Sequence, residues 1–81
     1  MKNRICIIGI TISNRRESAG QVNQILTDFG EMIIGRMGVP YRERKVSVIV
    51  VIVDGSNDQI GALTGKLGQI INVKVKSTIL I

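Results

Sequence analysis

The polar residues best suited to hold a ligand gather in one short stretch, between an apolar run and the first helical pattern. The stretch supplies an amide, two guanidinium groups, a hydroxyl and a glycine that would let a ligand approach the backbone: Asn14, Arg15, Arg16, Ser18 and Gly20. Guanidinium groups pair with carboxylates and phosphates, and free N–H groups at a helix start attract anions. We therefore expect a small anionic or amino-acid-like ligand here. The alternative is a solvated loop with an ordinary helix cap.

Residues for catalysis or metal binding are scarce. The chain has no His, no Trp and one Cys, Cys6, which we assign to a buried position in the first strand. One Cys without His cannot supply the usual zinc, haem or iron–sulfur ligands within one subunit, nor a nucleophile–His–acid triad. We expect no cofactor, no metal site and no enzyme. A carboxylate-based isomerase on a dimeric fold is the remaining catalytic alternative.

Composition indicates one small domain over residues 1–81. A chain of this length buries only about 60% of its unfolded surface, so a lone monomer would be marginally stable. The 11 basic residues outnumber the 6 acidic ones, which permits an anionic partner. No signal-peptide pattern and no apolar run of membrane-spanning length is present, so we expect a cytoplasmic protein with no membrane contact.

The elements that must position these residues are organised around one apolar run. Residues 46–53 are almost all Val and Ile, which is typical of a central strand covered on both faces. Residues 2–13 form the first strand, with the even positions from Cys6 to Ile12 as its better core face. Two further strands are expected at 31–39 and 71–76. The former should be an edge strand that stops before Pro40, because proline cannot donate to a ladder.

Two helices are expected, and their signals repeat 38 residues apart. Each begins with a Ser-x-x-Gln capping box, at Ser18 and Ser56, and ends at a glycine, Gly30 and Gly68. Gly30 is placed to end its helix with positive φ. Apolar residues follow each box at helical spacing. Gly61, with Gly65 one turn later, suggests tight packing of the second helix on the sheet or on its neighbour.

One strand–helix–strand unit used twice predicts a β-α-β-β-α-β chain. Right-handed crossovers then give an α+β, ferredoxin-like sandwich with an antiparallel sheet of order 4-1-3-2 and both helices on one face. The other face would be apolar, and we place Ile5, Ile7, Val51 and Val53 on it as an interface. Such a patch is unusual on a monomer, so we expect a homo-oligomer, a dimer or a tetramer.

Nucleic acid is disfavoured as a partner. The RNA-recognition module shares this topology but stacks bases on aromatic residues of its central strands, and here those strands have none. The basic segment 42–45 could touch phosphates, but a solvated hairpin is the simpler interpretation.

The element order, with a polar, glycine-containing first loop and an apolar sheet, resembles an ACT domain. Residues 14–23 (NRRESAGQVN), 60–68 (IGALTGKLG) and 73–77 (VKVKS) resemble the small proteins called iron-only hydrogenase system regulators. That family is similar to the C-terminal domain of the nickel-responsive repressor, which binds nickel through His and Cys; this chain has no His, so the nickel site does not carry over. The resemblance implies a regulatory, small-molecule-sensing module with its ligand at Asn14 to Gly20, where the loop meets a neighbouring subunit. It also implies a protein partner. The alternative is a structural or assembly protein acting through its oligomer or helix surface.

Overall fold

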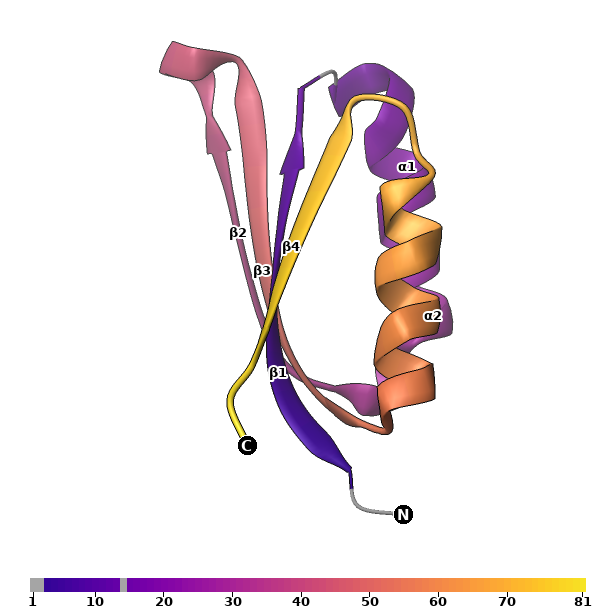
Figure 1. Cartoon of the computed structure of the whole chain (residues 1–81). Coiled ribbons are helices and arrows are strands. Elements are labelled where there is room, and N and C mark those ends of the chain that lie inside the picture. Colours follow the sequence, from indigo (N-terminus) through magenta and orange to yellow (C-terminus); the bar gives the residue numbers. More distant parts are fainter. Residues whose placement is uncertain (1–2, 14) are drawn as a thin grey trace.

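The computed structural model describes residues 3–13 and 15–81. In chain order the elements are β1 (Arg4–Ile12), α1 (Arg15–Asp28), the 3-10 turn η1 (Gly30–Met32), β2 (Ile33–Tyr41), the 3-10 turn η2 (Arg42–Arg44), β3 (Val46–Gly55), α2 (Asn57–Gly68) and β4 (Val73–Ile79) (Figure 1). The β-α-β-β-α-β order expected from the repeat is therefore confirmed.

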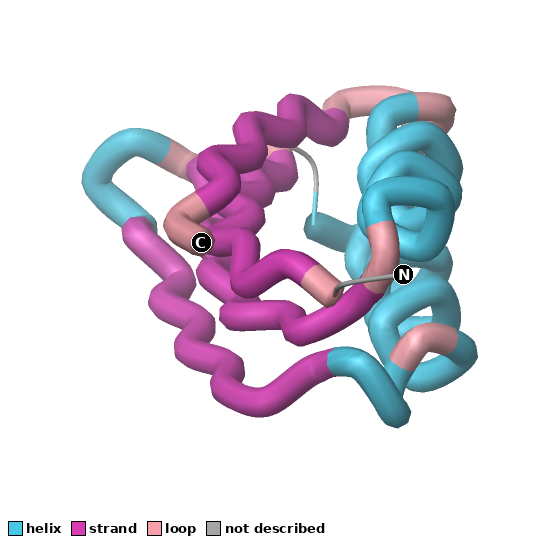
Figure 2. The backbone as a smooth tube through the Cα atoms, turned by 60° about the horizontal axis from the view of Figure 1, so that its bottom comes forward, coloured by secondary structure: helices cyan, strands magenta, loops and turns pink. Residues whose placement is uncertain are grey.

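The four strands form one antiparallel sheet of order β2-β3-β1-β4. This is the expected ferredoxin-like arrangement, in which the most apolar strands, β1 and β3, are central. Both helices pack on the same face of the sheet and leave the other face open (Figures 1 and 2). The pocket described below and the open face therefore lie on opposite sides of one layer of strands.

The core lies between the helices and the sheet. The even residues of β1 are buried there, and Cys6 behaves as a small core residue, as expected. The helices contribute a continuous set of apolar side chains that lie almost wholly out of contact with solvent: Val22, Leu26, Ile60, Leu63 and Leu67. Val73 and Val75 of β4 pack against this core, while Lys74 and Lys76 are exposed, as the alternation in the sequence predicted.

The placement of Val51 and Val53 on the open face was wrong. Both are 0% exposed and lie in the core beneath the helices. The antiparallel register pairs Val53 with Cys6 and Val51 with Ile8, and directly paired residues point to the same side of a sheet. The apolar run in the sequence has no alternation from which its facing could be read, and the pairing with β1 decides it.

The two Ser-x-x-Gln segments have different structures. Ser56 caps α2 as expected: its hydroxyl accepts from the Gln59 N–H at 3.1 Å, and the Gln59 side chain accepts from the Ser56 N–H at 2.9 Å. The capping box at Ser18 is wrong, because α1 already begins at Arg15 and places Ser18 inside the helix. The helix thus starts one turn earlier in the first unit than in the second.

The expected positive φ at Gly30 is wrong, because no glycine of the described chain has positive φ. α1 ends at Asp28, before Gly30 begins the turn η1, whereas α2 ends at Gly68 as expected. After α2 the left-handed residue is Asn72, with φ 65°. Asn tolerates this conformation because its short side chain can bond locally to the backbone.

Tight packing at Gly61 and Gly65 was not found. Both positions are exposed, and a Cβ atom added at either would meet no heavy atom within 4 Å. The helical stripe turns these glycines to solvent because Ile60, Leu63 and Leu67 take the core side.

Candidate functional site: a pocket between α1 and β2

A β-bulge in β2 decides which of its side chains face the helices. Ile33 pairs with Val53 and Gly35 pairs with Ile52, so Ile34 is inserted between two successive pairs. One extra residue turns every later side chain of a strand to the opposite face. Arg36, which pairs with Val51, consequently points to the helix side. Without the bulge it would point to the open face.

The strand also continues further than expected. Pro40 lies within β2 and pairs with Ser47, so the prediction that the strand stops before Pro40 was wrong. β2 is an edge strand, and proline is tolerated at an edge where its missing N–H removes no ladder bond. The bulge places Gly38 on the helix side, and the extension adds Pro40 there, next to the first half of α1.

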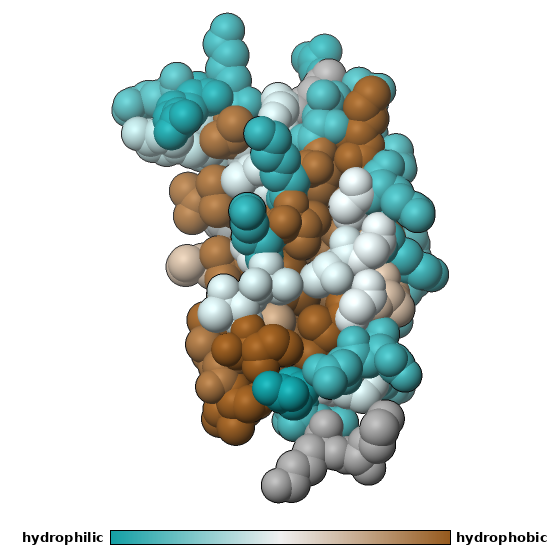
Figure 3. Space-filling model, viewed as in Figure 1, coloured by the Kyte–Doolittle hydropathy of each residue, from teal (hydrophilic) through white to brown (hydrophobic). Residues whose placement is uncertain are grey.

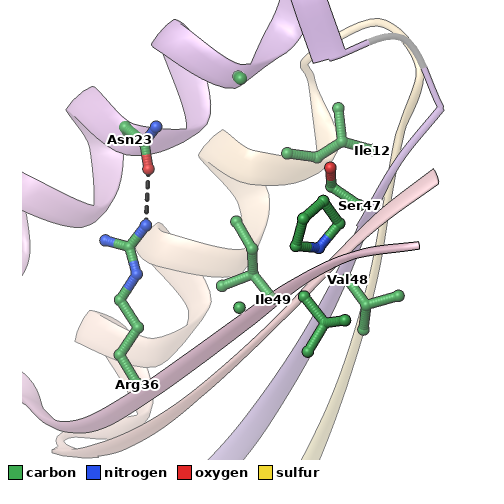
Figure 4. A pocket seen from close by; sticks show the side chains of 10 residues that line it. Ile12, Asn23, Arg36, Ser47, Val48 and Ile49 are labelled. Atoms are coloured by element: carbon green, nitrogen blue, oxygen red, sulfur yellow. Dashed lines mark hydrogen bonds between the residues drawn. The ribbon is translucent and has the colours of Figure 1, made fainter. Parts of the chain in front are cut away.

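A pocket of about 200 Å³ lies between these residues and α1. Figure 4 shows it bounded by the helix on one side and by β2 and β3 on the other. Three polar side chains line it, those of Asn23, Arg36 and Ser47. The other lining residues are apolar or small: Ile12, Ala19, Gly38, Val39, Pro40, Val48 and Ile49. Concave sites with apolar walls and a few polar groups are the usual form of small-molecule sites.

Arg36 and Asn23 meet across the mouth of this pocket. The Arg36 Nη2 atom donates to Asn23 Oδ1 at 2.6 Å, which joins α1 to the edge strand (Figure 4). Of the described residues, Asn23 is the one hydrogen-bond partner of this guanidinium group. Arginine carries five donors in a planar fork, so several remain available for an anion.

The pocket exists because small residues stand where the helix faces the edge strand. Ala19 lines it from α1, and Gly38 lines it from β2. A Cβ atom added at Gly38 would lie 3.7 Å from Ile49 Cγ1, which is ordinary van der Waals contact. A larger side chain at Gly38 would therefore occupy the pocket without straining the strand.

Of the predicted ligand residues that the structure describes, none lines this pocket, although their neighbour Ala19 does. Asn14 lies outside the described residues, as does the side chain of Arg15. Arg16 and Gly20 are exposed on α1. Ser18 is 0% exposed, and its hydroxyl donates to the Ile71 carbonyl at 2.7 Å. The expectation that Ser18 offers its hydroxyl to a ligand is therefore wrong: that hydroxyl ties α1 to the segment before β4.

Sequence reasoning missed Asn23, Arg36 and Ser47 as pocket residues. Gly35 and Arg36 do interrupt the apolar pattern of the edge strand, which is the available signal. The pattern alone gives no position for a bulge, so the side to which Arg36 points could not be read from it.

A second, acidic pocket of about 330 Å³ lies at the other end of the helical layer. Its lining includes three carboxylate side chains, Asp28, Glu31 and Asp54. Within residues 3–13 and 15–81, no group of three or more His, Cys, Asp or Glu side chains is arranged to hold a metal ion. We therefore take the pocket beside Arg36 as the candidate site.

The open face of the sheet is apolar over three strands. Its outward side chains on β1, β3 and β2 are Ile5, Ile7, Val48, Val50, Ile52, Met37, Val39 and Tyr41. Met37 is 62% exposed, and Val39 and Tyr41 are also exposed. In Figure 3 hydrophobic surface gathers over the strands, whereas hydrophilic surface lies mostly over the helices and the β2–β3 hairpin.

The fold and sequence together identify the family. The profile of the TM1266-like family, described as "Iron-only hydrogenase system regulator, putative", matches residues 4–77, and the chain belongs to this family. Among solved structures it is similar to the protein TM1266 from Thermotoga maritima, with 41% identity and a TM-score of 0.95. That similarity covers 99% of this chain and 100% of the other. No curated protein matches the chain.

More distant structures share the fold alone. A protein described as a "putative glycine cleavage system transcriptional repressor" has a TM-score of 0.69 at 15% identity, over 98% of this chain and 46% of that one. The divalent ion tolerance protein CutA1 from Ehrlichia chaffeensis has a TM-score of 0.52 at 15% identity, over 99% and 84% of the two chains. The ACT-like, ferredoxin-like fold expected from the sequence is thus shown. Neither helix in the described part of the chain could cross a membrane.

Proposed function

We propose that this chain is a non-catalytic regulatory module that senses a small molecule and works as an assembly of identical subunits. The observation that carries the proposal is the alternation along β2. Arg36, Gly38 and Pro40 face the helix side, and the residues between them, Met37 and Val39, face the open side by strand register, although Val39 also borders the pocket. A ligand that shifts this edge strand would act on both sides of the sheet, which gives binding a route to assembly.

Assembly through the open face is supported by its apolar surface. Ile7 and Val50 are already half-buried and Ile52 is 37% exposed, so covering each of them contributes a part of the roughly 1.5–3 kcal/mol of full burial. Association costs on the order of 4–15 kcal/mol in lost freedom, so the apolar side chains of both copies are needed to offset that cost. A second copy of the chain offers the same apolar face in return, and a two-fold axis makes such an interface self-complementary.

At the ligand site, the proposal keeps Asn14, Arg15, Arg16 and Gly20, next to a neighbouring subunit, and leaves Ser18 out. Arg16 is exposed there, and Ala19 leads directly into the pocket. The proposed location is the cytoplasm. The signal would pass to another protein of the iron-only hydrogenase system from which the family takes its description.

A thermal-shift screen of amino acids and small organic anions tests the sensing function. We expect at least one compound to raise the melting temperature of the wild-type chain, and the Arg16→Ala variant to lose that shift. Arg42→Ala is the matched control, because it removes the same exposed charge from the turn η2. A screen in which no compound stabilises the protein would contradict the proposal.

A further inference from the structure

We propose that the pocket between α1 and β2 binds a small monocarboxylate that has a short aliphatic tail and no ammonium group. This inference rests on the proposed sensing function and names the ligand class and the residues that select it. The carboxylate would pair with Arg36, and the tail would lie against the apolar wall formed by Ile12 and Ile49.

The carboxylate is indicated by the position and fixing of Arg36. Its hydrogen bond to Asn23 at 2.6 Å holds the guanidinium group at the mouth of the pocket, so less side-chain freedom remains to be lost on binding. A planar fork with free donors matches the two oxygens of a carboxylate. Arg36 is the one cationic side chain among the described lining residues, which suits a single negative charge better than a doubly charged phosphate.

That the proposed ligand has no ammonium group follows from the residues that line the pocket. None of the described residues that line the pocket is acidic. The Asn23 Oδ1 atom, which could accept from an ammonium group, already accepts from Arg36. An ammonium group placed beside Arg36 would meet a like charge without a carboxylate to compensate, which opposes binding. An amino acid should therefore bind more weakly than the matching 2-oxo acid.

The tail is limited by the size and chemistry of the walls. A pocket of about 200 Å³ is smaller than the ~300–1,000 Å³ typical of larger ligands, so a short tail fits. Ile12 is 2% exposed and Ile49 is 8% exposed, which gives a fixed apolar floor. The Ser47 hydroxyl lies beside Ile12, at the other end of the pocket from Arg36 (Figure 4), so the walls around the tail are apolar up to that hydroxyl.

The test compares four probes by isothermal titration calorimetry of the full chain: 3-methyl-2-oxobutanoate, 3-methylbutanoate, L-valine and inorganic phosphate. We expect both acids that lack an ammonium group to bind, with about tenfold or greater weakening for L-valine. We expect no measurable binding of phosphate. Amide NMR spectra of the wild-type chain should show the largest shifts at Asn23, Gly38 and Ser47, a readout that needs no variant.

Three variants locate the site. Arg36→Gln should weaken the 2-oxo acid by about tenfold or more, because a charge-assisted pair is lost. Arg44→Gln, which removes the same exposed charge from the turn η2, should leave binding unchanged. Gly38→Val should abolish binding by filling the pocket, with the circular dichroism spectrum retained. Any of three results would overturn the inference. They are the same affinity for Arg36→Gln and the wild type, the same affinity for L-valine and the 2-oxo acid, and no binding of either acid at millimolar concentration.

The same samples separate this inference from the broader function. If Arg16→Ala removes a ligand response while Arg36→Gln keeps it, the sensing function stands and the Arg36 pocket is wrong. If the 2-oxo acid binds at Arg36 but leaves the molar mass by light scattering unchanged, the ligand class stands and control of assembly is wrong.

Discussion

The two β-α-β units of this chain arise from one repeated pattern, but one is regular and the other is not. The second unit has an unbroken strand and a helix that begins at the complete capping box of Ser56. The first unit has a serine buried inside its helix, a bulge at Ile34 and a proline within its second strand. The irregular unit supplies Asn23 and Arg36 to the pocket, and β3 of the regular unit supplies Ser47, Val48 and Ile49.

This difference shows which departures from regularity have consequences for the site. The bulge turns Arg36 towards the helices and turns Met37 and Val39 towards the open face. A regular first unit would place the cation on the apolar face and would leave the pocket without its charged group. Irregular strand pairing next to sites is a recurrent way to re-aim a side chain.

The largest expected difference between the units concerns the two serines of the repeated motif. Asp is as good a helix cap as Ser, so Ser56→Asp should change the free energy of unfolding little. Ser18→Asp should cost about 3–5 kcal/mol, because it places a carboxylate in a buried position facing the Ile71 carbonyl. Urea unfolding of both variants measures the difference. Equal stabilities would mean that Ser18 also caps its helix.

A smaller difference is expected between two core positions related by the repeat, Leu63 in the second unit and Ile25 in the first. Leu63 is 0% exposed, so Leu63→Ala should cost about 2–5 kcal/mol. Ile25 is half-buried at the edge of the core, so Ile25→Ala should cost less. Urea unfolding of the two variants, at equal protein concentration, provides the comparison. A larger loss for Ile25→Ala would show that another subunit covers α1.

The smallest effects are expected at two exposed helical glycines, Gly20 and Gly61. Neither has a heavy atom within 4 Å of an added Cβ atom, so Ala at either position should stabilise the protein by roughly 0.4–1 kcal/mol. Thermal unfolding without ligand should give similar gains. Of the two substitutions, only Gly20→Ala should weaken the binding of a ligand that lies beside the first turns of α1. Loss of stability on Gly20→Ala in the ligand-free protein would indicate that this glycine is covered in the assembly.

Much of the fold could be predicted from the sequence because period and propensity act locally. The apolar run at residues 46–53, the capping box at Ser56 and the alternation at residues 73–76 each specify their element without help from distant residues, although the strand begins at Val73 and not at Ile71 as expected. The handedness of the crossovers then restricts the topology to the sheet order observed.

The site could not be predicted to the same extent because it depends on pairing between distant residues. The side taken by Val51 is set by its partner Ile8 on β1, and the side taken by Arg36 is set by the bulge at Ile34. The role of Ser18 depends on the Ile71 carbonyl, 53 residues away along the chain. None of these partners has a local signature in the sequence.

A charge placed on the open face tests the assembly at one position. Val50 lies on the central strand β3 and points to that face, and it pairs with Gly9 of β1 and Met37 of β2. Val50→Lys should separate the subunits, because a buried unpaired ammonium would oppose the interface. Gln21→Lys, which adds the same charge on an exposed position of α1, should leave the assembly intact.

The measurement that bears most directly on the account is the molar mass of the wild-type chain by light scattering at micromolar concentration. One subunit has a mass of 8.9 kDa. The account predicts at least twice that mass for the wild type and for Gln21→Lys, and the mass of one subunit for Val50→Lys. A stable wild-type protein of 8.9 kDa would contradict both the covered sheet face and the coupling through β2.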